Sequence, residues 1–285
     1  MKVAGFGLGL RTEFMAELLE KHEHAIDWLE IIPENWIDLG GNRGRDLERC
    51  AERWTLVPHS VSMSIGGLDP LDRKLFRDVG ALCRAIDAPF WSDHICYAVL
   101  DGKHVHDLLP LPCSDEALEH VLRRIAEARA MTDVPLVFEN PTYYVKMPGA
   151  TMSEPEFLTH VFRESGAGFL LDVNNVYVNS QNHGFDAKRY IDALPLDAVK
   201  QIHVAGHTVA GSVIVDTHRG HVVDAVWDLY RYTLARARRL IPTLLEWDSE
   251  LPKLEVLVGE IERARREADR ALTDVNGNKA AEKAA

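Results

Sequence analysis

The feature that most constrains the fold is a repeated alternation of short apolar runs with longer amphipathic segments. Runs rich in Val, Ile, Leu and Phe occupy residues 2–9, 28–34, 55–60, 89–96, 135–140, 168–175, 200–206 and 243–247. Helical patterns begin near residues 11, 72, 114, 153, 222 and 251. Alternating strands and helices predict a parallel sheet. Eight repeats favour a single (β/α)8 TIM barrel, with a doubly wound open sheet as the alternative.

The length of the chain is consistent with one such barrel. It has 285 residues, and α/β barrels of about 250 residues form single domains. No Pro-, Gly- or Ser-rich linker divides the sequence. We therefore expect a catalytic barrel domain over residues 1–272. Residues 273–285 are polar and low in complexity, which predicts a flexible C-terminal tail.

Composition excludes several classes of partner. The net charge of -12 argues against nucleic acid, because phosphate binding rests on clustered Lys and Arg. An acidic surface mostly serves solubility, and it would also suit a basic peptide or protein. The cysteines, Cys50, Cys83, Cys96 and Cys113, form no CxxC pair and predict reduced thiols in a cytoplasmic protein. No apolar run approaches the roughly 18 residues of a membrane span, and the N-terminus does not resemble a signal peptide.

Ligand-type residues stand at the ends of the predicted strands, where barrel enzymes carry their catalytic groups. They are His59, Asp93 and His94, Glu139, Asp172, His203 and Glu246. About one strand–helix unit separates each from the next, so all would converge at one mouth. Burying so many polar groups without partners would be costly. Divalent metal ions would neutralise them, so Glu246 at the end of TLLEW is expected to bind metal.

Further candidate ligands lie outside this set. Asp216 and His218 are two residues apart in the loop after the seventh predicted strand, so in an extended segment their side chains would point the same way. Asn174 is two residues beyond Asp172, so in a strand both side chains would point the same way. It is a candidate oxygen ligand, a substrate-orienting group or simply a turn residue. Histidine and carboxylate ligands suit iron, manganese or zinc, and this number of candidates predicts two or three ions.

The strand-end motifs together resemble a known family. HSVSMSIGG, WSDHICY, HDLLPLP, VFENPTYY, LLDVNNVYVN, QIHVAGH, DTHRGH and TLLEWD occur in this order between about residues 5 and 250. They resemble the DUF692 family of multinuclear non-heme iron-dependent oxidative enzymes, which includes methanobactin-biosynthesis oxidases. The resemblance implies a xylose-isomerase-like barrel with two or three irons and O2 as co-substrate. It also implies oxidation of a ribosomally synthesised precursor peptide, usually at cysteine, with a separate small leader-binding protein as partner.

The resemblance also assigns ligands. His59, His94 and Glu139 would hold one iron, and Glu139 would bridge to a second iron held by Asp172, His203 and Glu246. Asp216 and His218 would hold a third, with Asn174 as a further candidate.

Three other functions remain open from the sequence. Glu139, Asp172, His203 and Glu246 also resemble the metal site of single-metal sugar isomerases and epimerases with a xylose-isomerase-like barrel. A tri-zinc endonuclease-like hydrolase shares that site, but it needs a basic DNA groove. A scaffold that recruits a peptide without catalysis is the non-enzymatic alternative.

Overall fold

Eight parallel strands occupy the centre of the protein in a computed structural model that describes residues 3–21, 25–38 and 40–284. They are β1 (Phe6–Gly9), β2 (Trp28–Ile31), β3 (Thr55–Pro58), β4 (Trp91–His94), β7 (Leu136–Glu139), β8 (Gly168–Asp172), β9 (Val199–Ala205) and β12 (Thr243–Glu246). Each coincides with one of the eight predicted apolar runs. The alternation of strands and helices is therefore confirmed.

The sheet closes on itself. Its strand order is β3-β2-β1-β12-β9-β8-β7-β4, and neighbouring strands within it are parallel. The two outer strands meet at a bridge between His59 and Ser92, where Ser60 N donates to Ser92 O at 2.7 Å. The result is the predicted barrel. Among the described residues this β3–β4 seam carries a single bridge, whereas the other neighbouring pairs align three or four residues.

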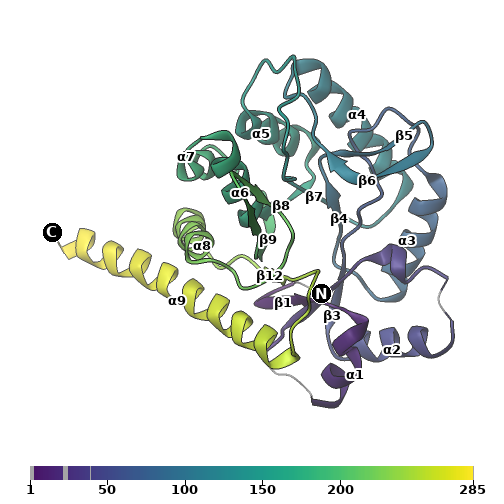
Figure 1. The fold of residues 1–285 in the computed structure, drawn as a ribbon, viewed down its shortest axis with the longest axis horizontal. Coiled ribbons are helices and arrows are strands. Elements are labelled where there is room, and N and C mark those ends of the chain that lie inside the picture. Colours follow the sequence, from purple (N-terminus) through teal and green to yellow (C-terminus); the bar gives the residue numbers. More distant parts are fainter. Residues whose placement is uncertain (1–2, 22–24, 39, 285) are drawn as a thin grey trace.

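Helices surround the strands, as Figure 1 shows. They are α1 (Thr12–Lys21), α2 (Gly41–Ala51), α3 (Arg73–Ala85), α4 (Asp115–Met131), α5 (Glu154–Ser165), α6 (Val173–His183), α7 (Ala187–Asp192), α8 (Asp224–Ala237) and α9 (Leu254–Ala284), with a 3-10 turn at Pro33–Asn35. Most pack an apolar face on the outside of the sheet, where the main hydrophobic core lies. None of the described helices combines the length and apolar character needed to cross a bilayer.

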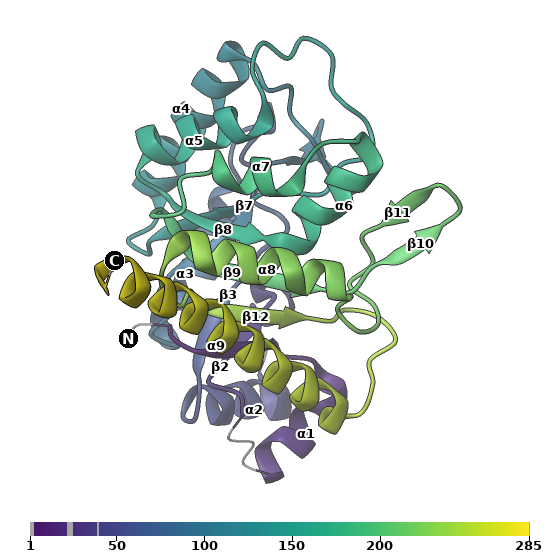
Figure 2. The ribbon, with the colours of Figure 1, turned by 90° about the vertical axis from the view of Figure 1, so that its left-hand side faces the viewer.

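Two small antiparallel hairpins interrupt the alternation. One pairs β5 (Tyr97–Leu100) with β6 (Lys103–Leu109), directly after β4. The other pairs β10 (Thr208–Ala210) with β11 (Val213–Val215), within the long loop after β9. Figure 2 shows β10 and β11 projecting from the body of the molecule, on the side toward which β12 points.

The barrel interior is built in two layers. A small apolar cluster, separate from the main core, contains Trp28, Val57, Val137, Leu170 and Leu244. Side chains two residues apart on a strand point the same way. The next inward positions are therefore Glu30, His59, Glu139, Asp172 and Glu246. The apolar layer fills the bottom of the barrel, and the polar layer lies at the C-terminal ends of the strands.

A glycine makes room for the lower layer. A Cβ atom on Gly7 of β1 would lie 2.4 Å from the indole ring of Trp28. That is closer than carbon atoms can approach, so the glycine allows the large ring to fill the barrel. The N-terminal GFGLG sequence thus serves barrel packing.

The C-terminal residues lie in a helix, and the flexible tail stays a prediction. Helix α9 runs without interruption from Leu254 to Ala284 and includes residues that we expected in a flexible tail from 273 onward. The physical reason is composition, because the final residues, NKAAEKAA, are rich in strong helix formers. The expected boundary at residue 272 therefore lies inside a helix.

Candidate metal centre

Six of the seven strand-end residues predicted from the sequence, all except Asp93, form one group at an end of the barrel. They are His59, immediately after β3, His94 in β4, Glu139 in β7, Asp172 in β8, His203 in β9 and Glu246 in β12. None exposes more than 7% of its surface. Three carboxylates and three imidazoles thus share one water-poor site, in which each needs a partner.

The first group of donors centres on Glu139. His59 Nε2 and His94 Nε2 each lie 3.4 Å from Glu139 Oε2. The two imidazole rings are 4.7 Å apart between centroids, and His59 Nδ1 lies 3.0 Å from the Ser92 hydroxyl. The Nε2 atoms of both rings therefore face the same carboxylate oxygen.

The second group shares that carboxylate. His203 Nδ1 lies 3.8 Å from Glu139 Oε2 and 3.1 Å from Glu246 Oε2. Donor atoms of Glu139, Asp172 and His203 all lie within 4.8 Å of one another. Asp172 Oδ1 accepts a hydrogen bond from Asn175 N at 2.7 Å, which leaves its other oxygen for the cluster. Glu139 therefore lies in both groups.

The third group involves the loop after β9. His218 Nδ1 lies 3.3 Å from Glu246 Oε1, and donor atoms of Asp172, His218 and Glu246 lie within 4.8 Å of one another. The other ring nitrogen of His218 lies 3.0 Å from Asp216 Oδ1. The backbone at His218 has a φ of 45°, so this segment is not extended as expected. Asp216 and His218 nevertheless face each other.

Asn174 lies beside Asp216. The sequence placed it in a strand, but β8 ends at Asp172, which caps α6, and Asn174 lies in the first turn of that helix. Its side-chain amide donates to Asp216 Oδ1 at 2.8 Å, and its oxygen lies 2.7 Å from His207 Nδ1. Both polar groups of this amide therefore contact the loop that carries Asp216.

Glu30 was missed by the sequence analysis. Its Oε2 atom lies 3.2 Å from His203 Nε2 and accepts a hydrogen bond from Gln201 Nε2 at 2.7 Å. Donor atoms of Glu30, His203 and Glu246 form a fourth group within 4.8 Å. A signal was present, because WLEII places a carboxylate in an apolar run as TLLEW does. Glu30 precedes the last residue of β2, so it does not stand at a strand end as the other candidates were expected to do.

Burial and charge together set the protonation of the site. Burial raises the pKa of Glu139 to about 7. Burial opposes a charge on His94, but Glu139 and Asp93 outweigh it and raise the pKa of this imidazole to about 9. Burial also opposes ionisation of Glu246, yet His218 and His203 hold the pKa of that carboxyl well below its usual range. Without a metal, the site therefore retains protons near neutral pH.

The residues fit a multinuclear metal centre. Glu139 Oε2 and Asp172 Oδ2 are buried and have no hydrogen-bond partner within the described chain. Such orphaned acceptors are rare and require an explanation, such as an ion. The donors are imidazole nitrogens and carboxylate oxygens, the set that suits first-row divalent metals. Within residues 3–21, 25–38 and 40–284, four such groups of three donors share members, so more than one ion could be held side by side.

The whole chain is similar to a described enzyme family. Residues 5–269 match the family described as "RiPP precursor modification enzyme MbnB/TglH/ChrH", where RiPP denotes a ribosomally synthesised and post-translationally modified peptide. A UPF0276 protein of Anaeromyxobacter sp. (strain Fw109-5) is 43% identical over 263 residues, which is 92% of each chain. A UPF0276 protein of Shewanella loihica is 38% identical over 95% of this chain and 97% of its own.

Solved structures with the same fold are more distant. Endonuclease IV from Thermus thermophilus superposes with a TM-score of 0.60 at 14% identity, covering 95% of this chain and all of that one. A xylose isomerase domain containing protein from Salmonella typhimurium gives a TM-score of 0.59 at 13% identity, over 94% and 99% of the two chains. D-psicose 3-epimerase from Clostridium cellulolyticum gives 0.58 at 12% identity, over 97% and 98%. At these identities the likeness confirms the xylose-isomerase-like barrel alone.

Proposed function

Because the chain belongs to the MbnB/TglH/ChrH family of RiPP precursor modification enzymes, also known as DUF692 or UPF0276, we propose that it oxidises a precursor peptide with iron and O2. The residue modified is a cysteine of that peptide. The enzyme works in the cytoplasm with two or three irons. A separate small protein binds the leader segment of the peptide and presents it.

One observation carries this proposal. Glu139 Oε2 lies 3.4 Å from two imidazole nitrogens and 3.8 Å from a third, and it has no hydrogen-bond partner in the described part of the chain. A buried carboxylate placed between two donor groups is suited to bridge two cations. That arrangement supports a centre with at least two metal ions, which we assign to iron.

We assign ligands accordingly. His59, His94 and Glu139 hold the first iron, and Glu139 with Asp172, His203 and Glu246 holds the second. His218 and Asp216 hold the third, near Asp172 and Glu246. Asn174 orients Asp216 through the hydrogen bond between their side chains.

Iron bound at these residues would supply the binding of a substrate thiolate and the activation of O2. The protein's own residues orient and insulate that chemistry. Glu30 and Gln201 both contact Nε2 of His203, so Nδ1 on the other side of the ring faces Glu246. The apolar layer beneath, including Trp28 and Leu244, excludes water from the closed end of the barrel. Reaction is thereby confined to the open mouth.

A single-metal sugar epimerase is the second candidate. Glu139, Asp172, His203 and Glu246 alone would serve one ion. The additional group formed by His59, His94 and Glu139 would then have no metal to bind, although these side chains are buried and face one another. The number of bound ions therefore separates the two functions.

Turnover tests the proposal. The anaerobically purified protein is loaded with Fe(II) and mixed with O2, a leader-binding partner and a cysteine-containing precursor peptide. We expect O2 uptake and a mass change located at cysteine. His59→Ala and Glu139→Ala should each lose iron and lower the rate by more than about 100-fold. His160→Ala, on the exposed face of α5, is the matched histidine control and should behave as wild type. Full turnover by either ligand variant would refute the assignment.

A further inference from the structure

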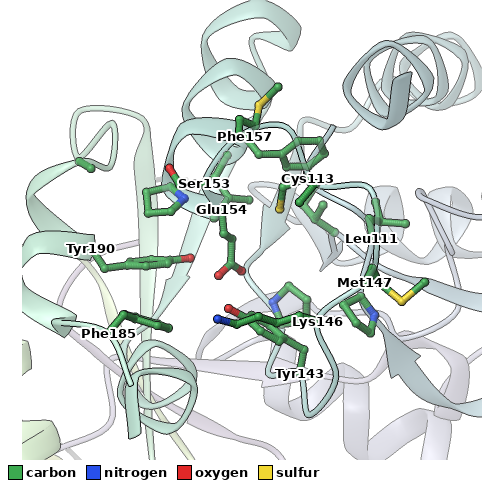
Figure 3. A pocket seen from close by; sticks show the side chains of 18 of the residues that line it. Leu111, Cys113, Tyr143, Lys146, Met147, Ser153, Glu154, Phe157, Phe185 and Tyr190 are labelled. Carbon is green, nitrogen blue, oxygen red and sulfur yellow. The ribbon is translucent and has the colours of Figure 1, made fainter. Parts of the chain in front are cut away.

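A large cavity lies beside the metal centre and is not used by the chemistry described above. Its volume is about 630 Å³, and it is bounded by the segment before α4, the segment after β7, the start of α5 and helix α7. Its walls are largely apolar and include Leu111, Met147, Met152, Phe157 and Phe185. Figure 3 shows Leu111, Met147, Phe157 and Phe185 around a common space. A cavity of this size accepts a complete long side chain.

A carboxylate points into this apolar space. Glu154, the first residue of α5, directs its carboxyl group into the cavity between Tyr190 and Tyr143 (Figure 3). Its Oε2 atom is buried and makes no hydrogen bond of ordinary geometry among the residues described, although the hydroxyls of Tyr190 and Tyr143 interact with the carboxyl group. An acceptor left unsatisfied in this way costs free energy unless a donor arrives from outside.

Among the described residues, no titratable group around Glu154 forms an ion pair with its carboxylate. Burial raises the pKa of Tyr143, Tyr190 and Cys113, so these groups stay neutral near neutral pH. Lys146, Asp186 and Arg189 line the exposed rim. Arg189 Nε lies 3.9 Å from Asp186 Oδ2, so those two charges offset each other there. Glu154 makes no salt bridge within 4.0 Å in the described chain.

Two residues of the cavity wall are close in sequence to residues of the candidate metal centre. Ile95, in its wall, directly follows His94, and Pro141, also in its wall, is two residues beyond Glu139. Neighbouring Cα atoms are about 3.8 Å apart. A peptide with one residue at the metals would therefore bring a residue a few positions away to this cavity.

We propose that the cavity binds a cationic side chain with a long apolar stem, such as lysine, of the precursor peptide, and that Glu154 receives its charged nitrogen. The assignment to a peptide rests on the proposed function, whereas the preference for a cation rests on the cavity itself. The stem would contact the apolar walls, and the nitrogen would donate to Glu154 Oε2 beside the hydroxyls of Tyr143 and Tyr190. The net charge of -12 favours the approach of such a peptide.

Protonation gives this site a recognisable pH dependence. Burial raises the pKa of Glu154 to about 7, and the nearby hydroxyls of Tyr190 and Tyr143 offset only part of that effect. A cation binds the ionised carboxylate, and an alkylammonium ion stays protonated throughout this range. Its affinity should therefore fall by roughly tenfold between pH 8 and pH 6, as the carboxylate takes up its proton.

Three probes of equal length test the chemistry: n-hexylammonium, n-hexanol and n-hexanoate. Their binding to the metal-loaded protein is measured by ligand-observed NMR at pH 8 and pH 6. We expect hexylammonium to bind roughly tenfold more tightly than hexanol at pH 8, and hexanoate to bind most weakly. Glu154→Gln should remove the preference for the ammonium ion. Glu156→Gln, exposed in the same first turn of α5, is the control and should retain it.

Each outcome decides the proposal. Equal binding of hexylammonium and hexanol would overturn it, and a preference for hexanoate would assign the cavity to an anion held by Lys146 and Arg189. If Glu154→Gln does not fold, as judged by thermal melting, the pH dependence of the wild-type protein decides alone. Affinity for hexylammonium that does not change between pH 6 and pH 8 would then contradict the role of Glu154.

A second measurement tests the peptide assignment. With the holoenzyme and the precursor peptide, hexylammonium should raise KM for the peptide and leave kcat unchanged. Inhibition that lowers kcat alone would overturn the peptide assignment. A protein that binds hexylammonium as predicted but oxidises no peptide would keep the cation site and lose the proposed function, so the two failures are distinguishable.

Discussion

At the scale of single residues, the centre depends on which nitrogen of each imidazole faces the carboxylates. His203 directs Nδ1 toward Glu246 and Glu139, and its Nε2 toward Glu30 and Gln201. A histidine that binds metal commonly donates its other ring N–H to a carboxylate, which fixes the ring and raises its basicity. Glu30 therefore orients His203, and Nδ1 is the atom available to a metal.

Glu30→Gln tests this orienting role. The amide keeps the size of the side chain but removes its charge, so the His203 ring loses a basic partner. We expect an affinity for Fe(II) about 10- to 100-fold weaker than that of wild type, with an unchanged circular dichroism spectrum. Chelator competition measures the affinity, and the exposed Glu48→Gln on α2 serves as the control. Wild-type affinity in Glu30→Gln would exclude the role.

Protons retained at the proposed ligands would make metal binding depend on pH. The pKa of Glu139 is raised to about 7 and that of His94 to about 9, so both groups hold protons below these values in the metal-free protein. A cation must displace them. Fe(II) affinity should therefore rise with pH between 6 and 8, by about tenfold per unit for each proton released. Calorimetry in buffers of different ionisation enthalpy counts those protons. An affinity independent of pH would contradict the assignment of these residues as ligands.

At the scale of elements, the strands were predictable, whereas the helices α2, α6 and α7 were not. Apolar runs ending in a carboxylate or histidine specify both layers of the barrel interior, because inward positions recur every second residue. Helix α6 was missed, since VNNVYVNSQNH is rich in Val, Tyr and Asn, which favour strands and turns over helices. Its formation depends on tertiary contacts. For example, the side-chain amide of Asn175 donates to Asn140 O at 3.0 Å, and the backbone N–H of Asn175 donates to the Asp172 carboxylate.

The loop that carries Asp216 and His218 depends on a close backbone approach. A Cβ atom on Gly206, just after β9, would lie 2.4 Å from the carbonyl oxygens of Arg219 and Gly220. Neither backbone oxygen can move away unless the segment around Arg219 and Gly220 moves with it. The position of His218 is thus coupled to the end of β9. The sequence alone did not reveal this coupling, because the two segments are joined by the β10–β11 hairpin.

Gly206→Ala should displace that segment. We expect a loss of about 1–3 kcal/mol in unfolding free energy and reduced metal occupancy at His218, with the group around His59 still loaded. Denaturant unfolding and metal analysis measure the two effects. Gly259→Ala in α9 is the control, because nothing lies within 4 Å of its added Cβ, and a helical alanine is more favourable than glycine. Equal metal content in both variants would refute the coupling.

At the scale of the whole molecule, the metal centre spans the weakest part of the barrel. Among the described residues β3 and β4 meet at one bridge, and His59 and His94 lie on its two sides. An ion held by both, together with Glu139 of β7, would tie these strands together. Part of the stability of the barrel should then come from the metal.

Removal of metal should therefore loosen the β3–β4 seam first. In chelator-treated protein we expect a lower Tm, because a ligand that binds only the folded state stabilises it. Amide hydrogen exchange should accelerate at Ser60, which donates across the seam, and change little between β8 and β9. Uniform acceleration over the barrel, or none at the seam, would contradict this account.

The most direct test of the central claim is the metal content of protein purified without oxygen. Elemental analysis gives the number and identity of the ions, and Mössbauer spectroscopy shows whether they interact. The shared carboxylate of Glu139 predicts two or three irons per chain with magnetic coupling between them. A single manganese or cobalt ion per chain would contradict the claim and favour a sugar epimerase. Three zinc ions in its place would favour a hydrolase.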